Sequence, residues 1–142
     1  MPTRGDDPEL LVDTSVAVAL VVGDHEHHAE TKRAVGAQRL GLAGHAVFET
    51  FSVLTRLPPP TRRTPDAVER LLTANFPYTR FLSPRATEAL FRRLASLGVA
   101  GGAVYDALVG ATAVEHRRPL ATRDRRALDV YRALSVEVEV LG

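Results

Sequence analysis

The stretch Leu10-Leu11-Val12-Asp13-Thr14-Ser15 constrains the fold of this chain more than any other. Three apolar residues run directly into a carboxylate and two hydroxyls, after which the pattern becomes helical. A short apolar run of this kind predicts a buried strand, with Asp13 at its carboxyl end. In an open α/β sheet, ligands bind at that end of the strands. Asp13 is therefore a candidate site residue, and the next question is which residues gather around it.

Short apolar runs alternate with helical segments along the rest of the chain. The Thr64-Pro65 and Ser83-Pro84 pairs are typical helix starts, and Asp24 is expected to cap the second helix. This alternation predicts an α/β fold whose parallel sheet is covered by helices on both faces. We expect strands near residues 39–43, 78–82, 119–122 and 136–140, and helices near 14–22, 25–35, 44–56, 65–76, 84–97, 103–116 and 125–134.

The length of 142 residues fits a single domain over residues 1–142. The chain has no cysteine, which excludes disulfides, zinc-thiolate sites and thiol catalysis. The acidic start does not resemble a secretory signal, and the apolar segment 10–22 is too short to cross a bilayer. We therefore expect a soluble, cytoplasmic protein without membrane segments, in which residues 1–8 form a loosely ordered extension.

Two further aspartates could share a site with Asp13. Asp124 follows the short apolar segment 119–122, so the two carboxylates meet at one sheet edge if those strands are neighbours. An aspartate before a helix is also a common N-cap, and that alternative stays open. Asp106 shares a helix face with the small and apolar residues Val109, Gly110 and Ala113, which predicts that it points inward. A buried carboxylate needs a partner, which a helix N-terminus supplies in part and a metal ion in full.

Glu49 is the least clear of the acidic candidates. On its expected helix it falls opposite the apolar stripe, together with His45, Ser52 and Arg56, and spacing alone predicts a solvated side chain. Several carboxylates converging on one point would repel one another, and Mg²⁺ or Mn²⁺ relieves such repulsion because these ions prefer oxygen ligands. A cluster of this kind can carry out metal-assisted phosphodiester hydrolysis.

Nearly all of the basic residues are arginines, with Lys32 the single lysine. Guanidinium groups suit phosphate oxygens, so an acidic cleft within an arginine-rich surface would suit a nucleic acid. Solvated arginines are an equally good explanation of the composition. Candidates for nucleic-acid binding are the arginines near Asp124 in the sequence, namely Arg117, Arg118, Arg123, Arg125 and Arg126.

Four segments resemble the four acidic blocks of PIN-domain nucleases, and in particular of the VapC toxins of bacterial type II toxin–antitoxin pairs, of the mycobacterial kind. The resemblance extends from about Leu10 to Val140, and the blocks occur in the family's order. The segments are LLVDTSV, AVFETFSVLTRL, GGAVYDALVGATA and LATRDRRALDVYRAL.

The resemblance implies a three-layer α/β/α PIN-like fold with a central five-stranded parallel sheet. It also implies a Mg²⁺- or Mn²⁺-dependent endoribonuclease in which metal-activated water attacks a phosphodiester. The acids that match the family's catalytic and metal-binding set are Asp13, Glu49, Asp106 and Asp124, with Thr14, Ser15 and Thr122 as supporting hydroxyls.

The same resemblance implies partners. These are a VapB-like antitoxin that covers the cleft, an RNA substrate such as tRNA or ribosomal RNA, and a second copy of the chain in a homodimer. The alternative function is a non-catalytic PIN-like module that binds RNA or an antitoxin. Intact acids at all four positions favour the enzyme.

Overall fold

A four-stranded parallel sheet with strand order β2-β1-β3-β4 forms the centre of the molecule. The computed structural model describes residues 8–142, so the extension expected at residues 1–8 lies, except for Pro8, outside the described residues. The strands are β1 (Glu9–Val12), β2 (Arg39–Leu42), β3 (Leu120–Thr122) and β4 (Val138–Val140). The helices are α1 (Thr14–Val21), α2 (His28–Val35), α3 (Ala46–Thr55), α4 (Pro65–Asn75), α5 (Pro84–Leu97), α6 (Ala103–His116) and α7 (Leu128–Ala133), with a 3-10 helix at Arg125–Ala127 before α7.

Strand β1 lies inside the sheet because the three side chains after Glu9 are apolar and fall on both faces. Leu10, Leu11 and Val12 are each at most 1% exposed. Val12 pairs with Leu42 of β2 on one side and with Ala121 of β3 on the other. This register brings the ends of β1 and β3 together, and Asp13 follows directly after β1.

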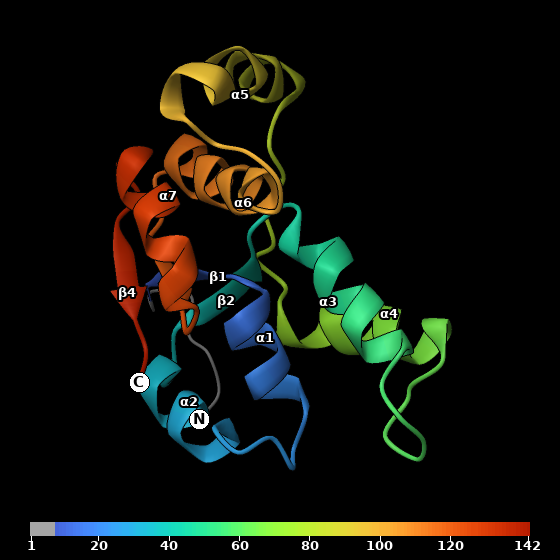
Figure 1. The fold of residues 1–142 in the computed structure, drawn as a ribbon. Coiled ribbons are helices and arrows are strands. Elements are labelled where there is room, and N and C mark those ends of the chain that lie inside the picture. Colours follow the sequence, from blue (N-terminus) through green and yellow to red (C-terminus); the bar gives the residue numbers. More distant parts are fainter. Residues whose placement is uncertain (1–7) are drawn as a thin grey trace.

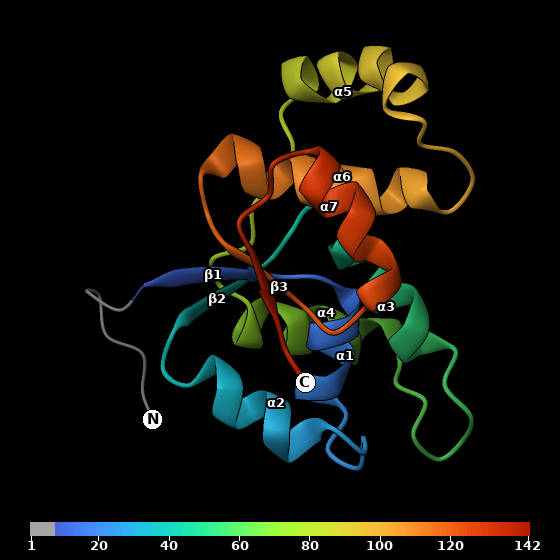
Figure 2. The same ribbon diagram turned by 60° about the vertical axis from the view of Figure 1, so that its left-hand side comes forward.

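Helices cover both faces of the sheet (Figures 1 and 2). Helices α6 and α7 pack together on one face, and α1 packs on the other with α2 and α3 beside it. Helix α4 lies against α3, and α5 lies outside α6, farther from the sheet. The predicted three-layer α/β/α arrangement is therefore confirmed, as are the helix starts at the Thr64 and Ser83 caps.

The prediction of five strands is wrong, because residues 78–82 form only a single bridge, between Arg80 and Ala43. This segment runs beside β2, and its Arg80 N–H donates to the Leu42 carbonyl at 3.1 Å. The Leu42 N–H, however, donates to the side-chain hydroxyl of Thr79 at 2.9 Å instead of to a backbone carbonyl. A side-chain acceptor in place of the backbone interrupts the ladder and prevents a regular fifth strand.

Helix α2 begins later than the sequence predicts, and Asp24 does not cap it. The helix starts at His28, with His27 at the N-cap position. The N–H of His27 donates to the ring Nδ1 of His25 at 3.1 Å, and the N–H of His28 donates to the His25 carbonyl. These turns occupy the residues that were expected to form the first helical turn.

None of the helices in the described residues is long and apolar enough to cross a membrane.

Close backbone contact at Gly41 gives a test of the packing beside β2. A Cβ atom at this position would lie 2.2 Å from the carbonyl oxygen of Tyr78, and backbone atoms cannot rotate away. We expect Gly41→Ala to lower the free energy of unfolding by about 3 kcal/mol through overpacking, measured by urea denaturation. Gly102→Ala is the matched control, because a Cβ there meets nothing within 4 Å, and it should change stability by less than about 0.5 kcal/mol. Equal stability of the two variants would contradict this packing.

Candidate active site

Four carboxylates from distant parts of the chain line one small pocket of about 70 Å³. They are Asp13, Glu49, Asp106 and Asp124, and the pocket lies beyond the carboxyl ends of β1 and β3. The structure therefore brings together all four acids named from the sequence. Thr14, Ser15, Val109 and Tyr131 complete the lining.

Each of the four acids stands at the N-terminal end of a helix. Asp13 is the N-cap of α1, and Asp124 caps the 3-10 helix that leads into α7. Glu49 lies in the first turn of α3, and Asp106 in the first turn of α6. The partial positive charge at helix N-termini stabilises carboxylates, so the fold itself offsets part of the repulsion within the pocket.

Asp13 is the most deeply held carboxylate, with only 5% of the residue exposed. Its Oδ1 accepts from the Ser15 hydroxyl at 2.5 Å and from the N–H of Val16 at 3.3 Å. Its Oδ2 accepts from the Thr122 hydroxyl at 2.5 Å and the Tyr131 hydroxyl at 3.0 Å. Burial raises the pKa of Asp13, and these four donors oppose that rise.

Two backbone groups fix the direction in which the hydroxyls donate. The N–H of Arg123 donates to Ser15 Oγ at 2.8 Å, and the N–H of Asp124 donates to Thr122 Oγ1 at 3.0 Å. Each hydroxyl therefore accepts from the loop after β3 and donates to Asp13. Two of the three predicted hydroxyls thus hold Asp13 in place. The third, Thr14, lies instead toward Glu49, with its hydroxyl 3.5 Å from Glu49 Oε1.

Glu49 lies in the acidic pocket although helical spacing predicted a solvated side chain. Ser52 and Arg56 on the same face of α3 are exposed, whereas Glu49 is half-buried in the lining of the acidic pocket. Burial raises the pKa of Glu49, and the negative charge of Asp13 adds to the rise, while His45 and the Thr14 hydroxyl oppose it. The family resemblance was the better guide to this residue.

Asp106 is half-buried and carries the clearest electrostatic signature of the site. Burial raises its pKa to about 6, and the charges of Asp124, Glu49 and Asp13 contribute in the same direction. The inward orientation predicted from its helix face is confirmed by its place in the pocket lining. A carboxylate surrounded by like charges in this way is a strong candidate for binding a cation.

Asp124 fills both of the roles left open by the sequence. Its Oδ1 accepts from the N–H of Arg126 at 3.0 Å, which is a capping interaction, and the side chain also lines the pocket. The exposed Arg126 guanidinium lies 3.4 Å from the same oxygen. Because a single oxygen accepts both bonds, Oδ2 remains available for a ligand in the pocket.

Tyr131 is a site residue that the sequence interpretation missed. It lies on α7, is 1% exposed, and donates its hydroxyl to Asp13. Burial raises the pKa of this phenol, and the charge of Asp13 adds to the effect, so the group stays protonated as a donor. A tyrosine on an amphipathic helix looks like a core residue, so the sequence carries no signal for this contact.

The arginines near Asp124 in the sequence are separated in the structure. Arg118 lies at the opposite end of β3, where its Nη2 pairs with Glu9 Oε2 at 2.9 Å. Arg117 precedes β3 at the same distant end and is exposed. Arg123 is directed toward α2, where its Nη1 lies 3.2 Å from the Thr31 hydroxyl. Only Arg125 and Arg126 of this set are exposed next to Asp124.

The polar side chains of the pocket all carry oxygen, which is the donor type that Mg²⁺ and Mn²⁺ prefer. Within residues 8–142, no three acidic or histidine side chains are placed closely enough to enclose an ion. Mg²⁺ usually keeps several waters and binds through one or two carboxylates. The residues present therefore fit a hydrated divalent ion held by part of the acidic set.

Comparison with known proteins agrees with this geometry. Residues 10–133 match the sequence profile of the PIN domain. The chain is 50% identical to ribonuclease VapC27 of Mycobacterium tuberculosis, over 94% of this chain and 97% of that protein. It is 46% identical to ribonuclease VapC40 of the same species, over 91% of this chain and 96% of that protein.

Solved structures share the fold at much lower sequence identity. VapBC2 from Rickettsia felis, bound to a DNA fragment from its promoter, aligns with a TM-score of 0.68 at 12% identity, over 94% of this chain and 99% of the other. DNA-bound VapBC from Salmonella typhimurium aligns with a TM-score of 0.66 at 17% identity, over 94% and 98% of the two chains. The match to the domain profile and the two close relatives show that this chain belongs to the PIN-domain family and, within it, to the VapC group.

Proposed function

We propose that this protein is a metal-dependent endoribonuclease that acts as the toxin of a VapBC-type toxin–antitoxin pair. The observation that carries the proposal is the convergence of four carboxylates, three of them with pKa values raised by burial, on one pocket at the ends of β1 and β3. The names of VapC27 and VapC40 as ribonucleases support the choice of RNA as substrate.

The residues of the pocket would hold Mg²⁺ or Mn²⁺ through Asp106 and the neighbouring acids. Such an ion would supply polarisation of the phosphodiester and activation of a water for hydrolysis. Asp13 supplies a fixed negative charge, because its hydrogen bonds to Ser15, Thr122 and Tyr131 prevent rotation. Glu49 and Asp124 line the same pocket and could orient the attacking water.

The negative charge of the acidic pocket also supports the proposed antitoxin partner. A cluster of acids attracts cationic groups, so an arginine of a VapB-like antitoxin that reached the pocket would neutralise it in place of the metal. The structural similarity to VapBC complexes supports this partner. The substrate would be a cellular RNA such as tRNA or ribosomal RNA, which places the activity in the cytoplasm, and we propose a homodimer as the assembled toxin.

Substitution of Asp106 tests the catalytic proposal most directly. We expect Asp106→Asn to reduce Mg²⁺-dependent cleavage of purified tRNA and ribosomal RNA by about 100-fold or more, because the variant loses a carboxylate that would hold the divalent ion. Cleavage is measured on gels with and without a chelator. Asp129→Asn is the matched control, because this exposed aspartate on α7 lies outside the pocket.

Asp13→Asn is a less specific test of catalysis, because the substitution is also expected to lower stability. All four partners of Asp13 are hydrogen-bond donors. The new amide group would face donors, and we expect a loss of about 1–3 kcal/mol of stability. Full cleavage in chelator, or full activity of Asp106→Asn, would contradict the proposed metal-dependent site. Absence of cleavage by the unsubstituted protein with Mg²⁺ or Mn²⁺ would favour the alternative of a non-catalytic module that binds RNA or an antitoxin.

The raised pKa of Asp106 predicts how pH and metal affect stability. Mg²⁺ at ten times its dissociation constant should stabilise the folded state by about 1.4 kcal/mol, which raises Tm by about 3–6 °C. The shift should shrink as the pH falls from 7.5 through 6, because protonated Asp106 no longer attracts the ion. Thermal unfolding followed by circular dichroism measures this shift.

Without metal, the contribution of Asp106 to the stability of the fold increases as the pH falls, whereas the stabilisation by Mg²⁺ decreases. The folded protein holds the Asp106 proton more tightly than the unfolded chain, so this residue makes the fold more stable as the pH falls from above 6 toward 4. Asp106→Asn should lack this contribution. The assignment of the raised pKa fails if the variant and the original protein show the same pH dependence.

The two exposed arginines beside Asp124 give a test of RNA binding. We expect the double variant Arg125→Glu, Arg126→Glu to bind RNA more weakly, and the slope of log K against log salt to fall by about 1.4, as expected for two lost phosphate contacts to single strands. Binding is measured by filter retention at several salt concentrations. Arg117→Glu is the control, because this exposed arginine lies at the far end of β3 and should bind RNA as before.

A further inference from the structure

A second hollow of about 280 Å³ opens directly beside the acidic pocket. The two share Thr14 and Glu49 in their linings, so they are direct neighbours on the surface. The wall of the second hollow is the polar face of α3, with His45 and Phe48 near the start of the helix and Arg56 just after its end. Its volume is close to the lower end for small-molecule pockets.

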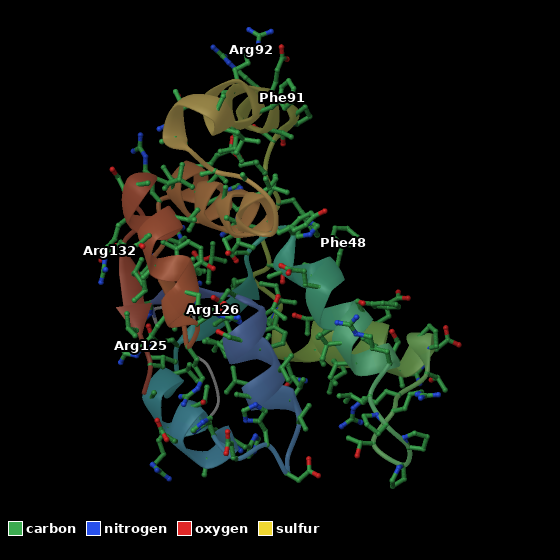
Figure 3. The ribbon with its side chains drawn as sticks, in the orientation of Figure 1. Phe48, Phe91, Arg92, Arg125, Arg126 and Arg132 are labelled. Atoms are coloured by element: carbon green, nitrogen blue, oxygen red, sulfur yellow. The ribbon has the colours of Figure 1, made fainter. Side chains whose placement is uncertain are left out.

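Aromatic rings are unusually exposed at the start of this wall. Phe48 is 62% exposed, and Figure 3 shows it on the α3 side of the molecule. The rings of His45 and Tyr105 stack with centroids 4.8 Å apart and planes 14° apart. Tyr105 does not line the hollow, so it supports the His45 ring from outside. The ring centroids of Phe48 and His45 are 6.3 Å apart, and the two ring planes are tilted by 45° relative to each other.

The rings are also adjacent to the acids in sequence. Phe48 directly precedes Glu49, and Tyr105 directly precedes Asp106. Glu49 lines both the hollow and the acidic pocket, so a group that stacks on Phe48 and His45 lies beside this carboxylate. At the other end of the hollow, Arg56 is exposed and forms no ion pair with any residue of the described part of the chain.

We propose that this hollow is a nucleotide-binding subsite, in which a base stacks on Phe48 and His45 while Arg56 binds a backbone phosphate. The proposal rests on the proposed ribonuclease function and specifies which part of the RNA the chain holds. Stacking on aromatic side chains and phosphate contact to arginine is the usual combination for single-stranded RNA. The occupant is thus an unpaired nucleotide next to the phosphate that lies in the acidic pocket.

Two probes separate stacking from phosphate binding. The first is a fluorescein-labelled eight-residue oligoadenylate, and the second is a labelled abasic ribose-phosphate oligomer of the same length. Fluorescence anisotropy in the presence of a chelator measures binding without cleavage. We expect the protein to bind oligoadenylate about tenfold more tightly than the abasic oligomer, in line with the effect of losing one base–aromatic stack.

Phe48→Ala should abolish this preference and leave the affinity for the abasic oligomer unchanged, while Phe48→Trp should retain it. Arg56→Gln should weaken the binding of both probes by the same factor. The matched controls are Phe91→Ala on α5 and Arg132→Gln on α7, which are exposed side chains away from the hollow and should behave like the unsubstituted protein (Figure 3).

Retention of the base preference by Phe48→Ala would overturn the proposal. A change of oligomeric state in Phe48→Ala, measured by light scattering, together with an unchanged base preference would assign this face to contact between copies of the chain and would also overturn it. Because no probe is cleaved in this assay, absence of ribonuclease activity would refute the proposed function without affecting these outcomes.

Discussion

The buried carboxylate of Asp13 is the interaction on which the rest of the site depends. An ionised group that is 5% exposed is tolerated only with partners, and here four donors supply them. Those donors come from α1, β3 and α7, so one carboxylate ties together the sheet and the helices on both of its faces. The cost of burying this charge is offset in part by hydrogen bonds that also fix its position, since the pKa of Asp13 is still raised.

The other three acids are stabilised by their position at the N-terminal ends of helices. Glu49, Asp106 and Asp124 each stand at the start of a helix, as Asp13 does, where free backbone N–H groups and the helix dipole favour negative charge. The compensation is incomplete, because the pKa of Asp106 is still raised to about 6. The folded chain therefore holds excess negative charge at one point, which is the condition that makes a divalent cation a favourable ligand.

Much of the fold could be predicted from local sequence signals, whereas the site required knowledge of three-dimensional neighbours. The caps at Thr64 and Ser83 are local hydrogen bonds, and both were predicted correctly. The fifth strand was not, because its ladder is interrupted by the Thr79 hydroxyl, a long-range contact that periodicity does not record. Glu49 was misplaced by helical spacing for a related reason: spacing identifies a polar face but not whether that face meets solvent or a cleft. Tyr131 was missed because its contact with Asp13 joins residues 118 positions apart.

The contact between Asp13 and Tyr131 makes formation of the pocket depend on both ends of the chain. The pocket draws on both ends of the chain, since Asp13 follows the first strand and is held by Thr122 and Tyr131 near the other end. During synthesis, the acids therefore cannot assemble until residues beyond 131 have emerged and β3 has inserted beside β1. An incomplete or locally unfolded chain has scattered carboxylates and no pocket. The proposed activity therefore depends on completion of the fold, because the segments at both ends of the chain must be in place before the pocket exists.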